Sequence, residues 1–307
     1  PIKSSAASDV YKRQVGLRYD YEHARCDFSK VQQPLNGNGE TKSLEQFNRS
    51  LHFGQFTPRF SMQYLSSHNQ LFYASVSKGY KAGGFNVSFL NNDDYLYSPE
   101  YNWNYEIGTK LSFLNNRLSA DLSLFYIDWR NQQITNTIPT VGNVIRNAGR
   151  SRNKGIEASF QARPTKSWMM YMNYGYTDAR FVHYQKEERG ILKDYEGNYL
   201  PMVPRHTFSL TTGYSFYDIC SWIDRLTLNA GVSVTGPIYW YEDNQAKQSP
   251  YALVNLRISI NKGCFTWEAW SKNLTNTDYL SYYFVTSKAY AQKGKPITLG
   301  TSVSISL

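Results

Sequence analysis

Residues 117–129, RLSADLSLFYIDW, alternate apolar and polar side chains along most of their length. The apolar or aromatic members stand at every second position: Leu118, Ala120, Leu122, Leu124 and Tyr126. Between them lie Ser119, Asp121, Ser123 and Phe125. Successive side chains of a β-strand point to opposite faces of the sheet, so this period of two predicts a strand with one apolar face.

The same period recurs before and after this segment and continues to the end of the chain. About twelve segments show it: 15–26, 55–66, 71–81, 102–114, 117–131, 153–164, 167–180, 206–216, 225–236, 251–261, 264–274 and 297–307. Many hold ten residues or more. Strands of soluble proteins average roughly 5–6 residues, whereas a tilted strand that crosses a bilayer takes about 9–11. The lengths therefore favour membrane-spanning strands.

The connections between these segments alternate between short and long. The short ones are SSHN, LNNR, PTK and NKG, with a somewhat longer YDICSWID. The long ones cover 27–54, 82–101, 132–152, 181–205, 237–250 and 275–296. Outer-membrane barrels have short periplasmic turns and long extracellular loops. The sequence therefore predicts an all-β fold, a transmembrane antiparallel β-barrel with its C-terminus on the periplasmic side.

A soluble β-sandwich or propeller would also alternate, with its apolar face as a dry core. The polar faces argue against that alternative, because they carry charges suited to a water-filled lumen: Glu106, Lys110, Asp121, Glu157, Arg163, Arg257, Glu268 and Lys272. Aromatic residues make up 16% of the chain and gather near the strand ends, as in the girdle at a membrane interface.

Composition argues against several other classes of protein. No run approaches the 18 or so apolar residues of a membrane-spanning helix. Cys26, Cys220 and Cys264 are odd in number and far apart, unlike a disulfide framework or a zinc site. The five histidines form no pair at metal-ligand spacing, so we expect no metal site and no cofactor. Although the net charge is +9, basic residues do not cluster with aromatic ones on one element, and we expect no nucleic-acid partner.

Five stretches each combine a strand with a recognisable turn. They are YASVSKGYKAGGFN (73–86), PEYNWNYEIGTKLSF (99–113), LFYIDWRNQQI (124–134), NAGRSRNKGIEASF (147–160) and LPMVPRHTFSLTTGY (200–214). With NLTNTDY (273–279) and the closing strand, their order and spacing resemble the C-terminal half of TonB-dependent outer-membrane receptors. Such transporters are 22-stranded barrels with a plugged lumen. The resemblance, from about Val15 to Leu307, implies about twelve C-terminal strands of such a barrel.

Glycines and the last strand carry further expectations. Gly83 and Gly84 in YKAGGFN are expected to permit positive φ where a strand leaves the sheet. Gly155 in NKGIE resembles a strand-entry glycine, with Glu157 pointing to the lumen. The closing GTSVSISL resembles the signal read by the barrel-assembly machinery, although Leu307 stands where the family usually has an aromatic residue.

The first residues fit none of this. They contain no apolar run of the roughly 7–15 residues that a secretory signal requires. SSAASDVYKRQ, residues 4–14, resembles the translation of a transposase adaptor used in sequencing libraries. We interpret 1–14 as non-native, the alternative being an ordinary polar N-terminus, and 15–307 as a gene fragment without plug, N-terminal strands, energy-coupling box or signal peptide. A half barrel has two unpaired edges, so we expect that this chain alone does not fold as a working pore.

The resemblance implies active uptake of a scarce ligand, most often a ferric siderophore, across the outer membrane of a Gram-negative bacterium. Its implied partners are the TonB complex, acting through the missing N-terminal region, the iron chelate, the lipid bilayer and the barrel-assembly machinery. Arginines and aromatic rings in the long loops suit an anionic, aromatic chelate. The candidate ligand-binding residues are Tyr239, Trp240, Tyr241, Arg146 and Arg150, among other loop groups that include Arg152, Tyr282, Tyr283 and Phe284. The alternative for each is a girdle residue or a solvated loop charge.

Three other functions remain open at this point. A complete twelve-stranded channel or translocator would have the even strand number of bacterial barrels. A membrane-embedded hydrolase needs a nucleophile and a base within hydrogen-bond reach, and His206 beside Thr207 and Ser209 is the candidate cluster. Since HTFS is better explained as the start of a strand, we expect that the protein is not an enzyme. A soluble carbohydrate-binding β domain is the last alternative.

Overall fold

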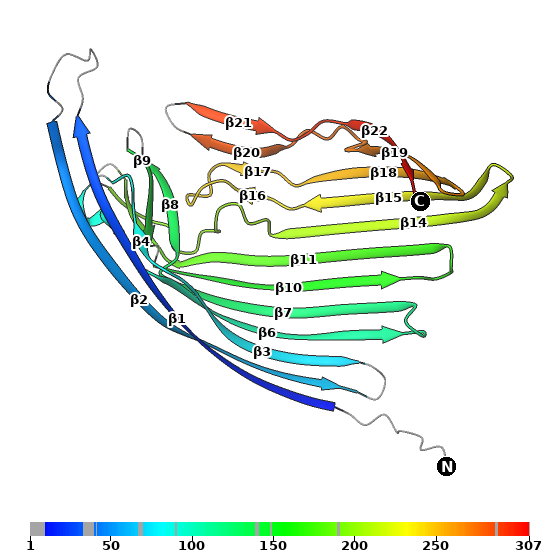
Figure 1. The fold of residues 1–307 in the computed structure, drawn as a ribbon, viewed down its shortest axis with the longest axis horizontal. Helices are drawn as coiled ribbons and strands as arrows, with labels where there is room; N and C mark the ends of the chain where they lie inside the picture. The colour runs from blue at the N-terminus through cyan, green and yellow to red at the C-terminus, as the bar shows by residue number, and fades with distance from the viewer. Residues whose placement is uncertain are drawn as a thin grey trace.

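The computed structural model describes residues 10–32, 40, 42–66, 70–89, 91–138, 141–147, 149–188, 191–285 and 288–306. Its main body is one 12-stranded sheet of antiparallel neighbours (Figure 1). The strands are β1 Val10–Gln32, β2 Lys42–Leu65, β3 Leu71–Lys81, β6 Glu100–Phe113, β7 Leu118–Arg130, β10 Arg150–Ala162, β11 Trp168–His183, β14 His206–Cys220, β15 Ile223–Thr235, β18 Tyr251–Lys262, β19 Phe265–Lys272 and β22 Thr298–Ile305. Each of the twelve predicted segments overlaps one of them, which confirms that prediction.

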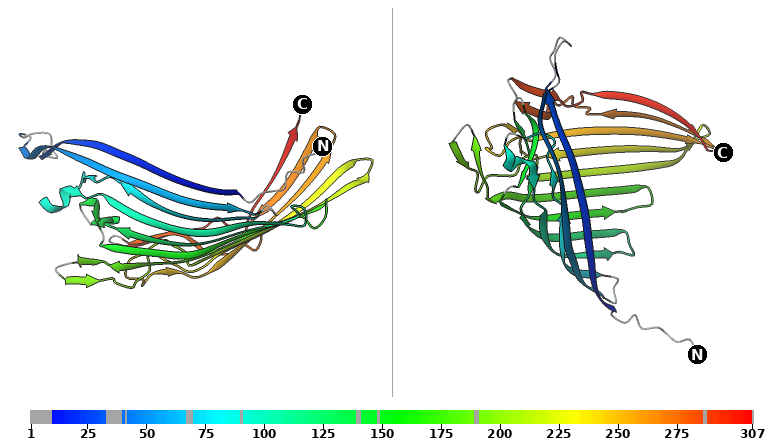
Figure 2. Two further views of the ribbon diagram at one scale, coloured as in Figure 1. Left: turned by 90° about the horizontal axis from the view of Figure 1, so that it is seen from below. Right: turned by 60° about the vertical axis from the view of Figure 1, so that its left-hand side comes forward.

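The strands follow one another around the sheet in chain order. Figure 2 shows the sheet curved like a trough, and β1 and β22 form its two edges in the described part of the chain. Figure 1 places the short turns at one end of the sheet and the longer connections at the other. Both the meander and the two unlike ends agree with the prediction from the connection lengths.

Two of the short turns use left-handed backbone. Between β6 and β7, Leu114, Asn115 and Asn116 have φ angles of 54°, 54° and 65°. Between β18 and β19, Gly263 has a φ of 53°. Asparagine and glycine tolerate this region better than other residues, which explains why they stand in these turns. Of the predicted turn SSHN, residues 67–69 lie outside the described residues.

One face of the sheet is apolar and uncovered. Ile107 pairs with Leu124, which pairs with Ile156, and the three side chains are 55%, 48% and 43% exposed. Soluble monomers rarely leave a contiguous apolar patch of more than a few hundred Å² open to water. The apolar face is therefore a lipid-facing surface, which removes the soluble sandwich and the soluble carbohydrate-binding domain as alternatives.

The charges predicted to line a lumen lie on the opposite, polar face. Lys110 is directly paired with Asp121, with their charged atoms 3.8 Å apart. Arg257 and Glu268 are diagonal neighbours on β18 and β19, and they also form an ion pair, at 3.8 Å. These neighbours share a face because residues two apart along a strand, and partners across it, point the same way.

The connection predicted over 27–54 is wrong, because β1 and β2 extend through most of it. Phe28 pairs with Phe47 and their rings stack at 4.9 Å, while the Asn48 amide donates to the carboxylate of Asp27. Cross-strand pairs of this kind hold a hairpin together beyond the length that a bilayer requires. Residues 33–39 and 41 lie outside the described residues.

The other five long connections contain short hairpins that periodicity did not reveal. They are β4 Gly84–Phe85 with β5 Leu96–Tyr97, β8 Gln133–Ile138 with β9 Gly142–Asn147, β12 Gln185–Glu188 with β13 Ile191–Asp194, β16 Ile238–Tyr239 with β17 Lys247–Gln248, and β20 Leu280–Val285 with β21 Ala289–Lys293. A short 3₁₀ helix, η1, covers Asn92–Tyr95. Within the described ranges, no helix has the length and apolarity needed to cross a membrane.

The expectation of positive φ at Gly83 and Gly84 is wrong. The positive-φ glycines of the described chain are Gly142, Gly197 and Gly263. A Cβ at Gly83 would instead meet the carbonyl oxygen of Tyr97, and one at Gly84 would lie 2.5 Å from the Tyr97 hydroxyl. These glycines are therefore required by close approach of β5 rather than by backbone conformation.

The strand β1 begins inside the stretch interpreted as adaptor-derived. Val10 to Gln14 pair with β2 in regular register, from Leu65 to Ser61. Backbone pairing does not depend on where a sequence came from, so the non-native origin of residues 1–14 stays a prediction. Residues 1–9 lie outside the described residues.

Candidate ligand-binding site

A cleft of about 670 Å³ lies among the hairpins at the loop end of the sheet. This volume falls within the range of small-molecule sites, about 300–1,000 Å³. Its lining comes from four connections: Ile134, Thr135 and Asn143; Lys186, Pro201 and Met202; Trp240, Tyr241 and Glu242; Tyr282, Tyr283, Phe284 and Val285. Because the strands of one sheet hold all four connections, residues far apart in sequence meet there.

One wall of the cleft is aromatic. Trp240 stands edge-on to Tyr282, with ring centroids 6.3 Å apart and an interplanar angle of 80°. Tyr241 stands edge-on to Tyr283 at 6.3 Å and 76°. Phe284 continues the wall, 5.7 Å from Tyr282. Edge-to-face arrangements suit the quadrupoles of aromatic rings and leave ring faces available for a flat ligand.

Hydrogen bonds fix this wall. The backbone N–H of Val285 donates to the Tyr241 hydroxyl at 2.5 Å, which joins the β16–β17 hairpin to the β20–β21 hairpin. The backbone N–H of Trp240 donates to the carbonyl of Ala246 at 2.9 Å and closes the β16–β17 hairpin. Burial raises the pKa of Tyr241 above its ordinary value, so the hydroxyl is neutral at physiological pH.

Trp240 is the most deeply placed member of the wall, with 6% of its surface exposed. Its buried indole N–H has no hydrogen-bond acceptor within the described part of the chain. An unpaired buried donor costs about 1–3 kcal/mol, and native proteins keep few of them. A ligand that brings an acceptor and shifts the wall slightly would recover that loss.

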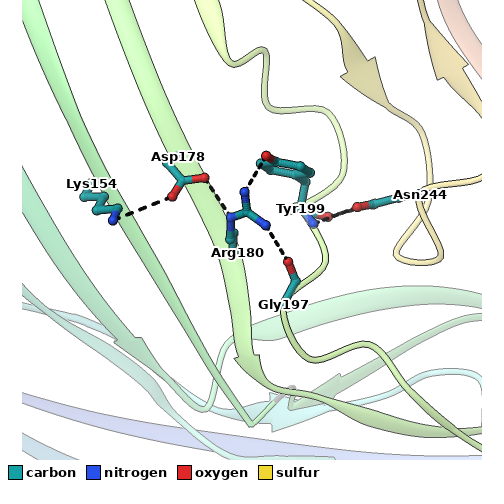
Figure 3. Close-up of polar contacts among 6 residues, drawn as sticks. All are labelled: Lys154, Asp178, Arg180, Gly197, Tyr199 and Asn244. Atoms are coloured by element: carbon teal, nitrogen blue, oxygen red, sulfur yellow. Dashed lines mark hydrogen bonds and ion pairs between the residues drawn. The ribbon is translucent and has the colours of Figure 1, made fainter.

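Tyr239 supports the wall from outside the cleft. Its ring stacks on Tyr199 at 5.4 Å and 6°, and its carbonyl accepts a hydrogen bond from Met202 N–H at 2.8 Å. Asn244 anchors the same hairpin: its Oδ1 accepts from Tyr199 N–H at 2.7 Å and its Nδ2 donates to the Tyr199 carbonyl at 2.9 Å. Figure 3 shows this anchor beside Arg180.

Arg146 lies in a different group of contacts. It forms an ion pair with Asp94, and Asn86 ties the same two loops together through three hydrogen bonds. Two of them join Asn86 to the backbone of Ile145, beside Arg146, at 2.8 Å. Arg146 thus fastens β9 to the loop before β6, and it does not line the cleft.

Arg150 is also engaged away from the cleft. Its Nε contacts Oδ1 of Asp128 at 2.5 Å on the apolar-face side of the sheet. Of the five candidate residues, the structure places Trp240 and Tyr241 in the cleft, and Tyr239, Arg146 and Arg150 beside or away from it. Met202, Pro201 and Lys186 were not candidates, and isolated residues in polar loops give no periodic signal that would single them out.

The residues of the candidate hydrolase cluster do not come together in the structure, because they lie along one strand. His206 contacts the Tyr174 hydroxyl through Nδ1 at 3.0 Å, while Ser209 accepts from Asn173 at 3.2 Å. His206 and Ser209 are three residues apart on β14, so their side chains point to opposite faces. Among the residues that the structure describes, no group of three or more His, Cys, Asp or Glu is placed to hold a metal ion.

Comparison with known families identifies this arrangement. The family described as "TonB dependent receptor-like, beta-barrel" matches residues 7–276. The chain belongs to the TonB-dependent receptor family. The resemblance inferred from the strand-and-turn stretches is thereby confirmed, and with it the outer membrane of Gram-negative bacteria as the location. The family consists of receptors and transporters rather than enzymes.

Individual relatives agree with this membership. The chain is 26% identical over 241 residues to the probable TonB-dependent siderophore receptor PiuA of Acinetobacter baumannii, covering 73% of this chain and 30% of the relative. It is 24% identical over 303 residues to the pesticin receptor of Yersinia pestis, covering 94% and 40%. The crystal structure of the ferric yersiniabactin uptake receptor FyuA from Yersinia pestis matches the fold with a TM-score of 0.79 at 20% identity, over 96% of this chain and 43% of that one.

The chain thus spans 30–40% of the length of these two relatives. The match to part of a larger TonB-dependent barrel agrees with the prediction of about twelve strands from a plugged barrel.

Proposed function

We propose that this chain forms the C-terminal part of the barrel of an outer-membrane receptor that imports a ferric siderophore with energy from the TonB complex. The observation that carries the proposal is the aromatic cleft at the loop end of the sheet. Relatives whose names refer to siderophore receptors support the class of ligand. The short share of each relative that the chain covers supports a plug and further strands elsewhere in the protein.

The cleft favours an aromatic ligand over a purely charged one. Its wall carries Trp240, Tyr241 and Tyr283, whereas the lining includes one cation, Lys186, and one carboxylate, Glu242. The nearest predicted arginines, Arg146 and Arg150, are bound to carboxylates of this chain. Stacking and apolar contact would therefore supply most of the affinity here, and neutralisation of the chelate's charge would come from elsewhere in the receptor.

Iron uptake by the full-length receptor tests the proposal. Trp240→Ala and Tyr283→Ala each remove one ring of the wall, and we expect uptake of the cognate radiolabelled iron chelate to fall about tenfold or more, as for hot-spot aromatics. Trp222→Ala is the matched control, since Trp222 is 82% exposed in the turn between β14 and β15 at the opposite end.

Three results would contradict the proposal. If uptake of a panel of ferric chelates did not depend on Trp240, the proposed site would be wrong. If uptake did not depend on the TonB complex, the proposed energy source would be wrong. Steady ion conductance by this chain alone in a planar bilayer would instead support a complete small channel.

A further inference from the structure

Beyond the loop end of the sheet, β1 and β2 continue as a ribbon of two strands (Figure 1). The strand β3 pairs with β2 from Arg59 to Leu65, whereas β1 stays paired with β2 as far as Lys42. Between Lys42 and Arg59, the pairing partner of β2 in the described part of the chain is therefore β1 alone. A two-stranded hairpin is at best marginally stable by itself in water. A further link between the two strands would stabilise this ribbon.

The ribbon brings two histidines together. His23 and His52 are far apart in sequence, so the spacing of the histidines predicts no metal site, but the two are direct partners in the register of the strands. Direct partners have Cβ atoms about 4.5–5.5 Å apart. The two imidazole rings are stacked, with their centroids 4.3 Å apart and an interplanar angle of 4°. The register thus pairs two metal-ligating side chains that belong to no common sequence motif.

Both rings lie on the outer surface of the ribbon. Leu17, Tyr19 and Tyr21 precede His23 at every second position of β1 on the same face, and they are 68%, 55% and 61% exposed. Tyrosine is enriched where a membrane protein meets the water. The histidines stand one row further out than Tyr21, about 6.6 Å along the strand, and both are exposed. A metal ion dissolved outside the membrane can therefore reach them.

Tyr21 supports one of the two rings. Its hydroxyl oxygen lies 2.8 Å from Nδ1 of His52. When the Nδ1–H group donates to this oxygen, Nε2 of the same ring keeps its lone pair for a metal ion. Histidines that bind metals almost always donate their other ring N–H to such a partner, which fixes the tautomer and the orientation of the ring. His52 therefore already has the outer contact that a metal ligand requires.

We infer that His23 and His52 together bind a divalent transition metal ion of the class of Cu²⁺, Ni²⁺ and Zn²⁺. Imidazole nitrogen is a preferred ligand of these ions, whereas Ca²⁺ and Mg²⁺ select oxygen. Two nitrogens that each bind one ion at about 2.0–2.1 Å lie at most about 4.2 Å apart, which a small tilt of the two exposed rings reaches. Water completes the coordination, because the described part of the chain places no third His, Cys, Asp or Glu with them. The ion links β1 to β2 outside the membrane, whatever the receptor transports.

Metal binding by the full-length receptor in detergent, first freed of metal with a chelator, tests this inference. Cu²⁺ alone probes the ligands, because its electron paramagnetic resonance spectrum distinguishes two bound nitrogens from one, and Zn²⁺ alone probes the affinity by calorimetry. His23→Gln and His52→Gln each remove one ligand, and Tyr21→Phe removes the outer contact. His206→Gln is the matched control, since His206 contacts the Tyr174 hydroxyl through Nδ1 at 3.0 Å but has tyrosines as its ring neighbours. Heat-modifiable gel mobility confirms that each variant folds.

We expect a two-nitrogen Cu²⁺ signal from the wild type and from the His206 variant, and its loss in each variant of the pair. The affinity for Zn²⁺ should fall about 100-fold in those two variants and about tenfold in Tyr21→Phe, because outer contacts contribute 10–100-fold to metal affinity and ligands contribute more. Added Zn²⁺ should slow hydrogen exchange across residues 21–25 and 50–54 where both histidines are present. Unchanged Zn²⁺ affinity in the His23 and His52 variants, an unchanged nitrogen count, or displacement of Zn²⁺ by equimolar Ca²⁺ would each overturn the inference.

Discussion

Arg146 holds Asp94 through two parallel hydrogen bonds, Nε to Oδ1 at 2.7 Å and Nη2 to Oδ2 at 2.8 Å. The carboxylate is 8% exposed and the arginine 34%. Arg146 is one of the ligand-binding candidates predicted from the sequence, and in the structure it holds two loops together.

Replacing this arginine should therefore affect stability before it affects ligand binding. Arg146→Ala removes two hydrogen bonds from the buried carboxylate of Asp94. We expect the free energy of unfolding to fall by about 1–3 kcal/mol, discounted for the partial exposure of the arginine. Arg25→Ala is the control, because the Arg25–Asp27 pair is 63% and 65% exposed and should contribute little. Denaturant titration with protease digestion of the loops measures both. Unchanged stability with abolished ligand binding would return Arg146 to the ligand site.

The anchor at Asn244 should control the aromatic wall of the cleft. Asn244 has a φ of 55° and makes two hydrogen bonds to Tyr199. Asn244→Gly keeps the backbone conformation and loses the bonds, whereas Asn244→Ala loses the bonds and adds about 1–2 kcal/mol of left-handed strain. Hydrogen exchange across 237–248 should therefore rise in both variants and rise more in the alanine variant. Equal exchange in all three proteins would show that the anchor is not needed.

Gly155 should tolerate no side chain. A Cβ there would meet the carbonyl oxygen of Tyr176 and lie 2.5 Å from the Phe125 ring. We expect Gly155→Ala to destabilise the barrel by about 1–3 kcal/mol, as overpacking does. Gly231→Ala is the control, since its Cβ would make an ordinary contact of 3.6 Å with Thr211. Similar unfolding midpoints for the two variants would contradict the steric argument.

Asp224 should make the short-turn end sensitive to acid. Hydrogen bonds from the Gly263 N–H and from Lys262, both at 2.7 Å, hold the pKa of Asp224 below its ordinary value. A lowered folded-state pKa means that the stabilisation is present above the unfolded pKa of about 3.9 and is lost as pH falls through the folded value. The difference in unfolding free energy between wild type and Asp224→Asn should shrink as pH drops below about 4. A difference that is constant from pH 7 to 3 would disprove the linkage.

The strands could be predicted because apolar and polar side chains alternate with a period of two along each of them. The Leu118–Tyr126 pattern survives in β7, and partners such as Ile107 and Ile156 fall in register beside it. The connections could not be predicted in the same way. The strands of their hairpins are two to six residues long, too short to show a period, and the hairpins depend on contacts such as Asn244–Tyr199 between distant loops.

The candidate site was partly predictable for the same reason. Clusters of aromatic residues, Tyr239–Tyr241 and Tyr282–Phe284, are visible in the sequence, and two of the three members of the first line the cleft. The role of the arginines was not visible, because only the fold shows that Arg146 and Arg150 face Asp94 and Asp128.

The measurement that tests the account most directly is a set of long sequencing reads of the source DNA upstream of the codon for Val15. The account predicts a coding region for about ten more strands, a plug and a signal peptide in the same frame, as a 22-stranded plugged transporter requires. A signal peptide directly before Val15 would contradict it, because the chain would then be a complete twelve-stranded barrel without the part on which TonB acts.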